Sequence, residues 1–337
     1  MRARIPPHEA LHDGPSALPA LPACVHYAGA ERHLRKALEL QASAGLRFDI
    51  AGDCEDGAPV GAERAHAQMI AGLVASDANR CGRFGARVHD VLHPATDDEI
   101  DALVGIAGER LAFLALPKAR GASDVAAFLA RVDAARARHG TRHRIPVSVL
   151  IETPGAVREA FAIAALPGIV SLDFGTLDYV SAHQGAIPLS AMESPGQFDH
   201  ALLRRAKAEV AAAALSHGVV PAHGVTRALD DPEQAYADAR RARDEFGFLR
   251  MWSIHPSQIE PIVRAFAPNA GEVAEAAAML AAAQDADWAP LAIGGKLHDR
   301  ASYRYFWSVL QRAHATGAAV SETARPWLEA AAGSRPR

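Results

Sequence analysis

Three carboxylates stand close together in the stretch FDIAGDCEDG, residues 48–57. They are Asp53, Glu55 and Asp56, and they follow the apolar run 48–51, which is typical of a buried strand. A turn accounts for an aspartate and a glycine at the end of a strand, but it accounts less well for Glu55. Because clustered carboxylates repel one another, the pattern predicts that a cationic group lies among them.

Glu152 and Asp178 are a second pair of carboxylates with a predicted chemical role. Glu152 ends the apolar stretch 145–152, and Asp178 follows the next such stretch, 169–175. Two carboxylates that leave positions open for water suit Mg²⁺, a hard cation that binds oxygen ligands. The alternative from spacing alone is structural, with Glu152 capping the following helix and Asp178 as a loop residue. Both interpretations stay open at this point.

Arg87 interrupts the apolar stretch 85–91, and a cation inside a buried strand is costly unless it is paired. It either neutralises the acidic cluster or presents its planar fork to the carboxylate of a substrate. Other predicted strand ends also carry ionisable residues, namely Lys118, Asp173, His223 and His255.

The elements that must position these residues alternate along the chain beyond residue 22. Short apolar stretches predict strands at 23–28, 48–53, 85–91, 111–117, 145–152, 169–175, 218–223 and 251–255. Stretches rich in Ala, Glu and Arg predict helices at 31–44, 61–75, 97–108, 122–138, 155–165, 200–216, 232–245 and 257–266. This alternation predicts a (β/α)₈ TIM barrel, in which chemistry sits at the C-terminal ends of the strands. An open doubly wound sheet is the alternative, although no G-x-G-x-x-G follows the first strand.

The segment after residue 266 exceeds what a minimal barrel needs. We expect a further helix at 268–288, a turn or arm at 289–299 and a last helix at 300–317. The chain is thus predicted to have three parts: a flexible N-terminal arm (1–21), a barrel (22–270) and a C-terminal helical extension and lid (271–337).

Composition excludes several classes of function. The chain has 337 residues, a net charge of -4 and a pI near 6.5, which argues against a nucleic-acid partner. No apolar run approaches the roughly 18 residues of a membrane span, and the N-terminus lacks the apolar core of a signal peptide. Three cysteines without a Cys-x-x-Cys pair cannot form a complete internal disulfide framework. We therefore predict a reduced, cytoplasmic protein with neither a membrane nor a nucleic-acid partner.

Six motifs, taken together and in order, resemble the HpcH/HpaI aldolase family in its citrate lyase β-subunit and malyl-CoA lyase branch. The motifs are GDCEDGAPVGAERAHA, ARVHD, LALPKARGASDV, VLIETPGAVREAFAIA, LDFGTLDYVSAHQG and SIHPSQIEPIVRAFAPNAGEVAEA. They are similar, in turn, to the family's Asp-Leu-Glu-Asp segment, Val-Arg-Val-Asn strand, Leu-Pro-Lys strand, Ile-Glu-Thr motif, Phe-Gly-x-x-Asp loop and Ile-His-Pro-x-Gln-Ile signature. The resemblance covers roughly residues 22–315 and implies the barrel independently of the strand pattern.

The resemblance also implies roles for particular residues. It implies Mg²⁺, or Mn²⁺ in its place, held by Glu152 and Asp178, with water and substrate oxygens completing the coordination. It implies that Arg87 binds the carboxylate of an α-keto acid such as pyruvate, glyoxylate or oxaloacetate. Glu55 and Asp56 would support the site through hydrogen bonds to metal-bound waters or to Arg87.

Asp299 is the remaining residue to which the resemblance assigns a role. In the malyl-CoA lyase branch, an Asp in a C-terminal Gly-Lys-x-x-Asp segment reaches a neighbouring subunit's site and exchanges a proton with the acyl methyl group. The segment GGKLHD supplies Asp299 at that position. The resemblance thus implies a homo-oligomer, a trimer or a hexamer, that cleaves a malyl-, citramalyl- or citryl-CoA-like thioester into an acetyl thioester and a small α-keto acid, with the metal as Lewis acid.

Four positions depart from the family pattern: Glu63, His89, His223 and Met251. We expect these changes to disturb the rim where a CoA thioester would lie, while leaving the metal site intact. Two alternatives therefore remain open. One is an aldolase that acts on free hydroxy-keto acids without CoA, and the other is a non-catalytic relative that binds a keto acid, in which Asp299 is dispensable and Glu152 caps a helix.

Overall fold

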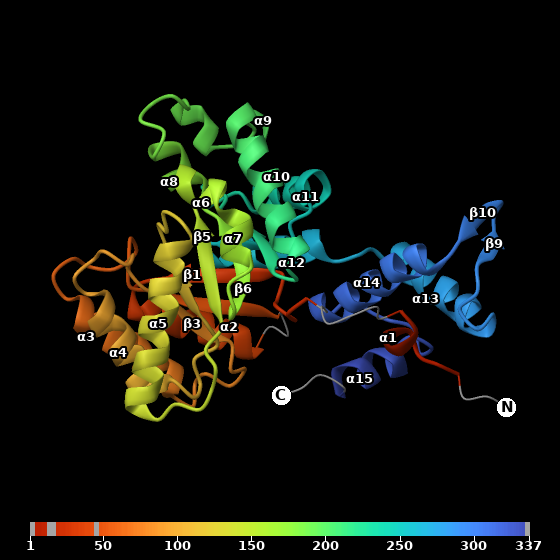
Figure 1. Cartoon of the computed structure of the whole chain (residues 1–337), viewed down its shortest axis with the longest axis horizontal. Coiled ribbons are helices and arrows are strands. Elements are labelled where there is room, and N and C mark those ends of the chain that lie inside the picture. The colour runs from red at the N-terminus through yellow and green to blue at the C-terminus, as the bar shows by residue number, and fades with distance from the viewer. Residues whose placement is uncertain (1–3, 12–17, 44–46, 334–337) are drawn as a thin grey trace. The chain divides into compact units, whose positions relative to one another are not determined.

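Eight parallel strands close into a barrel, in the order β1 to β8, in the computed structural model of this chain (Figure 1). The structure describes residues 4–11, 18–43 and 47–333. The strands are β1 (Cys24–Ala28), β2 (Phe48–Asp53), β3 (Phe84–Arg87), β4 (Leu114–Leu116), β5 (Val147–Ile151), β6 (Ile169–Phe174), β7 (Val220–His223) and β8 (Arg250–Ser253). Because β8 pairs with β1, with Cys24 opposite Met251, no edge is left open. The predicted barrel is confirmed, and the open-sheet alternative is wrong.

The strands are continuous apolar runs because both of their faces are buried. Every residue of β2, β3, β4 and β5 is buried, as expected when helices cover the outside of a parallel barrel and side chains fill the inside. All eight predicted strands are present. The third and fourth are shorter than we expected, because β3 ends at Arg87 and β4 spans only Leu114–Leu116.

Helices follow the strands in sequence and surround the barrel (Figure 1). The larger ones are α2 (Glu31–Ser43), α3 (Glu63–Ala75), α4 (Thr96–Ala107), α5 (Ala122–His139), α10 (Ala201–Ser216), α11 (Pro232–Phe246) and α12 (Ile259–Phe266). The helix predicted at 155–165 is two short ones, α6 (Pro154–Arg158) and α7 (Ala160–Ala164). The pattern did not predict the short elements α8 (Thr176–Ser181), η1 (Leu189–Met192) and α9 (Gly196–Asp199) that follow β6, nor the 3₁₀ turn η2 (Pro256–Gln258) as an element separate from α12.

The inside of the barrel carries both apolar and charged side chains. An apolar cluster there includes Tyr27 and Trp252. Strand register sets Asp53 of β2 directly beside Arg87 of β3. Lower in the barrel, Arg250 donates a hydrogen bond of 2.7 Å to Asp49, so this buried arginine is paired. The register thus brings oppositely charged residues from different strands together.

Of the described residues, 18–43 and 47–265 form one compact unit, and 4–11 and 266–333 form a second one. The second unit contains α1 (Pro7–Ala10), α13 (Ala270–Asp285), the hairpin of β9 (Leu291–Ile293) and β10 (Lys296–His298), α14 (Arg300–Thr316) and α15 (Arg325–Gly333). Its core includes Trp288, Tyr303, Trp307, Leu310 and Trp327. The predicted turn or arm at 289–299 thus contains a hairpin, whose turn glycines Gly294 and Gly295 both have positive φ.

The helix predicted as the last one, α14, is followed by α15, so that prediction is wrong. The division into an arm (1–21), a barrel (22–270) and an extension and lid (271–337) stays a prediction. Residues 1–3 and 12–17 of the arm and 334–337 of the extension lie outside the described residues. Within the described part of the chain, none of the helices has the length and apolarity needed to cross a membrane.

Candidate active site

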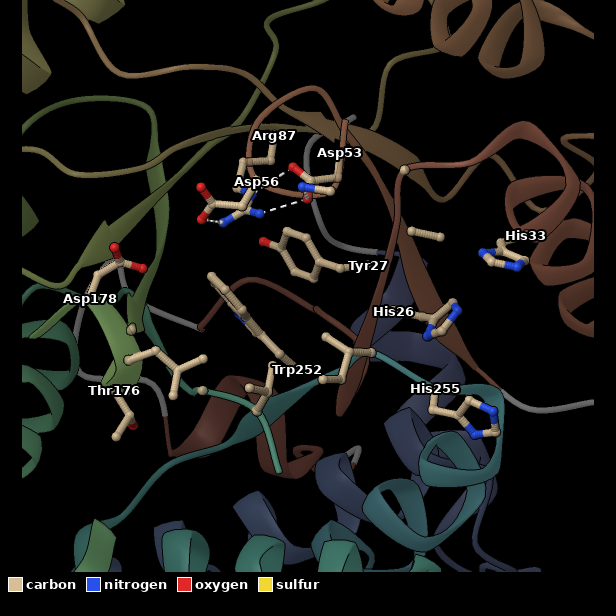
Figure 2. Close-up of a pocket in the computed structure, with 18 of the residues that line it drawn as sticks. His26, Tyr27, His33, Asp53, Asp56, Arg87, Thr176, Asp178, Trp252 and His255 are labelled. Carbon is tan, nitrogen blue, oxygen red and sulfur yellow. Dashed lines mark hydrogen bonds and ion pairs between the residues drawn. The ribbon is translucent and has the colours of Figure 1, made fainter. Parts of the chain in front are cut away.

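A cavity of about 540 Å³ opens at the C-terminal ends of the barrel strands. Its lining includes Tyr27 of β1, Asp53 of β2, Arg87 of β3, Glu152 directly after β5 and Asp178 in the first turn of α8, which follows β6. Figure 2 shows Arg87, Asp53 and Asp56 grouped together, with the ring of Tyr27 below them and Asp178 apart from them on the left. The cavity therefore collects ionisable groups at the barrel end where this fold carries its chemistry.

Arg87 is held by a carboxylate on the neighbouring strand. Its Nε donates to Asp53 Oδ1 at 2.8 Å and its Nη2 to Asp53 Oδ2 at 2.6 Å, a two-point contact that fixes the guanidinium plane. Asp53 also accepts the backbone N–H of Gly57 at 2.9 Å, which ties down the loop after β2. Burial opposes the charge, yet Asp53 and Glu55 raise the pKa of Arg87 further above its usual value.

Two cations neutralise the acidic cluster of the opening motif. Arg87 Nη1 lies 2.9 Å from Glu55 Oε2 and 3.9 Å from Asp56 Oδ2. Lys118 Nζ donates to Glu55, donates to Asp56 Oδ1 at 3.1 Å and lies 3.8 Å from Asp178 Oδ1. Burial alone would lower the pKa of Lys118, but its hydrogen bond to Glu55 and the nearby carboxylates raise it. These contacts confirm that a cationic group lies among the acids, and the binding of a substrate carboxylate by Arg87 stays a prediction.

Glu152 is a buried carboxyl group at the wall of the cavity, only 2% exposed. Its Oε1 accepts the backbone N–H of Lys118 at 2.7 Å. Burial, and then the charge of Asp178, raise the pKa of Glu152 to about 8. Thr153, not Glu152, caps the following helix, because Thr153 Oγ1 accepts the N–H of Ala156 at 3.0 Å. The helix-cap interpretation of Glu152 is therefore wrong.

The surroundings of Glu152 and Asp178 fit a divalent cation. Asp178 lies in the first turn of α8 rather than in a loop. A Cβ atom at Gly175 would lie 2.1 Å from Glu152 Oε2, so the glycine leaves room for that carboxylate. Five carboxyl groups near the cavity outnumber three cationic side chains. The carboxyl groups belong to Asp53, Glu55, Asp56, Glu152 and Asp178, and the cations are Arg87, Lys118 and the exposed Lys36, which pairs with Glu39. A buried carboxyl with a raised pKa amid surplus negative charge favours a bound cation, and an all-oxygen donor set suits Mg²⁺.

The chain supplies few ligands of its own for such an ion. Among the described residues, no group of three or more His, Cys, Asp or Glu side chains is arranged to hold a metal. An ion bound by Glu152 and Asp178 would therefore take its other ligands from water or substrate, which is the usual arrangement for Mg²⁺ in enzymes.

Asp299 belongs to the second compact unit and is described there. It is the N-cap of α14, and its Oδ1 accepts the N–H of Ala301 at 2.9 Å. Its carboxylate is exposed to solvent. The capping contact alone accounts for an aspartate at this position. The proton-exchange role implied by the family stays a prediction.

Lys118 and Tyr27 are among the residues that contact or line the site but were not assigned roles from the sequence. Lys118 stands at a predicted strand end inside a quoted motif, so its position could have been used to find it. Tyr27 lines the cavity with its ring centroid 4.3 Å from that of Trp252. Nothing in the pattern of the first strand distinguishes this tyrosine from an ordinary core aromatic residue.

Two of the departures from the family pattern do not lie at the rim of the cavity. His223 is fully buried, and its ring stacks on Phe198 of α9 with 5.1 Å between ring centroids. Met251 is also fully buried, and neither residue lines the cavity. The expectation that these two changes disturb a thioester site is therefore wrong. Glu63 begins α3, and His89 pairs with Glu99 at 2.6 Å.

Comparisons with known proteins agree on the family. The family model described as "HpcH/HpaI aldolase/citrate lyase" matches residues 51–256. An L-malyl-CoA/β-methylmalyl-CoA lyase from Rhodobacter capsulatus is 28% identical over 212 residues, which cover 60% of this chain and 66%, just under two thirds, of that enzyme.

Solved structures show the same fold. A citrate lyase from Burkholderia xenovorans LB400 is 50% identical, with a TM-score of 0.86, and the match covers 96% of this chain and 99% of that chain. The CitE protein from Mycobacterium tuberculosis, in complex with magnesium, acetoacetate and coenzyme A, is 24% identical with a TM-score of 0.68, and the match covers 88% of this chain and 99% of that one.

Proposed function

The chain belongs to the HpcH/HpaI aldolase/citrate lyase family, and on that premise we propose that it is a carbon–carbon lyase. Its proposed substrate is a β-hydroxyacyl thioester of the malyl-, citramalyl- or citryl-CoA type. The products are an acetyl thioester and a small α-keto acid. The relatives named above as malyl-CoA lyase and citrate lyase support this reaction class.

One observation carries the proposal: Glu152 and Asp178 line the same cavity as Arg87, in a site with more carboxyl groups than cations. An anionic keto acid would be repelled from such a site unless further positive charge were present. We propose that Mg²⁺, or Mn²⁺ in its place, supplies that charge at Glu152 and Asp178. When bound there, the ion would act as a Lewis acid for the substrate oxygen that becomes the keto oxygen.

The side chains of the chain would orient the substrate for cleavage. Arg87, fixed by Asp53, would hold the carboxylate of the keto-acid half, with Glu55 and Asp56 keeping the guanidinium and Lys118 in place. This is catalysis by positioning. Cleavage releases the hydroxyl proton, moves the electron pair of the carbon–carbon bond to the thioester enolate and returns one proton to the new methyl group. The reaction is therefore proton-neutral overall.

Asp299 is proposed to give that proton to the enolate and to take it back in the condensing direction. A carboxyl group exchanging a proton with carbon is general acid–base catalysis. On the family pattern, Asp299 acts on the site of a neighbouring subunit. The proposal therefore includes a homo-oligomer, a trimer or hexamer, and places the enzyme in the cytoplasm.

The alternatives of a free-acid aldolase and a non-catalytic relative lose part of their support. The aldolase rested on changes at four positions, and two of them, His223 and Met251, are buried away from the cavity. The non-catalytic relative predicted that Glu152 caps a helix, a role that Thr153 performs.

An assay of condensation tests the proposal against both alternatives. The protein is mixed with acetyl-CoA, MgCl₂ and either glyoxylate or pyruvate, and the acyl-CoA products are measured by mass spectrometry. Deuterium uptake into acetyl-CoA in D₂O is followed in parallel. The lyase predicts condensation and exchange that EDTA and a Glu152→Gln variant abolish. Condensation of a free aldehyde with pyruvate but not of acetyl-CoA would favour the aldolase, and keto-acid binding insensitive to EDTA without turnover would favour the non-catalytic relative.

A further inference from the structure

Tyr27 carries a hydroxyl group that has no partner among the described residues, although it is buried beside the cavity. The residue is 6% exposed, it lines the cavity, and its Oη makes no hydrogen bond to any described residue. Buried polar groups are almost always hydrogen-bonded, and an unpaired one costs free energy. The hydroxyl is therefore a group that a ligand could satisfy.

The ring of Tyr27 is held so that the direction of this hydroxyl is fixed. Its centroid lies 4.3 Å from that of Trp252, with 31° between the planes. Trp252 is itself fixed, because its Nε1 donates to Asp173 Oδ2 at 2.9 Å. In Figure 2 the hydroxyl of Tyr27 points toward the side of the cavity where Asp56 and Asp178 lie. Packing against Trp252 thus fixes the direction of the hydroxyl toward this part of the cavity.

Arg87 lies next to this hydroxyl but has few N–H groups left for a substrate. Its Cζ atom is 5.4 Å from the centroid of the Tyr27 ring. Its Nε and Nη2 already donate to Asp53, and its Nη1 pairs with Glu55. A carboxylate that arrives at Arg87 would therefore gain from a second donor. Burial raises the pKa of Tyr27 well above its usual value, so the hydroxyl keeps its proton and can act as that donor.

We propose that the hydroxyl of Tyr27 donates a hydrogen bond to the carboxylate of the α-keto acid bound beside Arg87. Tyr27 is then a substrate-binding residue that favours ligands with a carboxylate in this position. The inference rests on the proposed function, because it concerns the keto-acid half of the same substrate.

A Tyr27→Phe variant tests this by removing the hydroxyl and keeping the ring that packs against Trp252. Pyruvate binding in the presence of MgCl₂ is measured by calorimetry, and KM and kcat are measured in the condensation assay. We expect the Kd and KM for the keto acid to rise about 10- to 100-fold, which is the value of a hydrogen bond to a charged group. Because the bond is made equally in the ground and transition states, kcat should change little.

Two controls separate this role from a structural one. Tyr236→Phe removes a hydroxyl from α11, where the ring packs 4.6 Å from Arg264 Cζ, and it should change neither Kd nor KM. Without ligand, Tyr27→Phe should unfold at the same temperature as the wild type or higher, because no internal hydrogen bond is lost.

The possible outcomes distinguish the two proposals. If the wild type binds pyruvate and the Tyr27→Phe variant binds it with the same Kd, the role of Tyr27 is overturned but the proposed function is not. A fall in kcat at constant KM would also overturn it, since it would place the donor at a reacting oxygen. Wild-type protein that binds no keto acid in the presence of MgCl₂ would overturn the proposed function itself.

Discussion

Gly175 offers a way to disturb the candidate metal site without changing either ligand. It precedes α8, and a Cβ atom there would lie 2.1 Å from Glu152 Oε2, 2.7 Å from Glu152 Cβ and 3.1 Å from Glu152 Cδ. Its φ is -89°, which alanine adopts without strain. The effect of Gly175→Ala would therefore come from the collision with Glu152 and not from the backbone.

The size of the effect follows from which atoms collide. Because Glu152 Cβ is itself too close, rotating the end of the side chain does not relieve the clash, and the backbone at Gly175 or Glu152 must shift as well. Overpacking a buried site typically costs about 1–3 kcal/mol of unfolding free energy. Misplacing a metal ligand typically costs about 10- to 100-fold in metal affinity. We expect both losses in Gly175→Ala.

Calorimetric titration with MgCl₂ in the presence of pyruvate measures the affinity, and thermal unfolding measures the stability. Gly72→Ala is the matched control, because Gly72 lies on the exposed face of α3 with no atom within 4 Å of its added Cβ. That variant should bind Mg²⁺ normally and be more stable by about 1 kcal/mol, since alanine is the better helix former. Normal Mg²⁺ affinity in Gly175→Ala would refute the assignment of Glu152 as a ligand.

Three further predictions concern Arg87, Asp299 and His26. Arg87→Lys cannot reproduce the two-point contact with Asp53, so kcat/KM for the keto acid should fall roughly 10- to 100-fold. An unchanged kcat/KM would show that Arg87 does not bind the substrate. Asp299→Asn keeps a good N-cap for α14, so the melting temperature should not change. Because the amide cannot exchange a proton as the carboxyl does, kcat should fall roughly 10²- to 10⁴-fold. An equal kcat would leave Asp299 only its capping role. Burial lowers the pKa of His26 from 6.5 to about 4, so the folded state keeps this side chain neutral at pH values where the unfolded state binds a proton. The free energy of unfolding should therefore be fully retained above pH 6.5 and should fall as the pH drops toward 4, by up to about 1.4 kcal/mol per pH unit. Chemical denaturation across this pH range should show that the free energy of unfolding changes less steeply with pH in His26→Gln than in the wild type. Identical pH dependence in the two proteins would contradict the lowered pKa of His26.

The barrel could be predicted from the sequence because strands buried on both faces appear as continuous apolar runs. The ends of those runs were less informative. Val88 and Leu111 are fully buried although they lie outside β3 and β4, so burial continues beyond the bounds of these strands. The elements α8, η1 and α9 have four to six residues each, which is too short for a helical period to show.

The candidate site was only partly predictable for a related reason. Polar residues at strand ends stand out against apolar runs, which is how Arg87 and Glu152 were found. His223 and Met251 were placed wrongly, because a strand that is apolar on both faces does not reveal which residues point into the barrel. The unpaired hydroxyl of Tyr27 depends on Trp252 and Arg87, which are far away in the sequence, so only the structure could show it.

The most direct test of the account is to locate the metal. Crystals soaked with MnCl₂ and pyruvate would be measured at a wavelength where Mn²⁺ scatters anomalously. The account predicts one anomalous peak within coordination distance of the carboxylates of both Glu152 and Asp178, with the pyruvate carboxylate at Arg87. Pyruvate bound in the cavity with no peak between those two residues, or a peak at a different set of ligands, would contradict it.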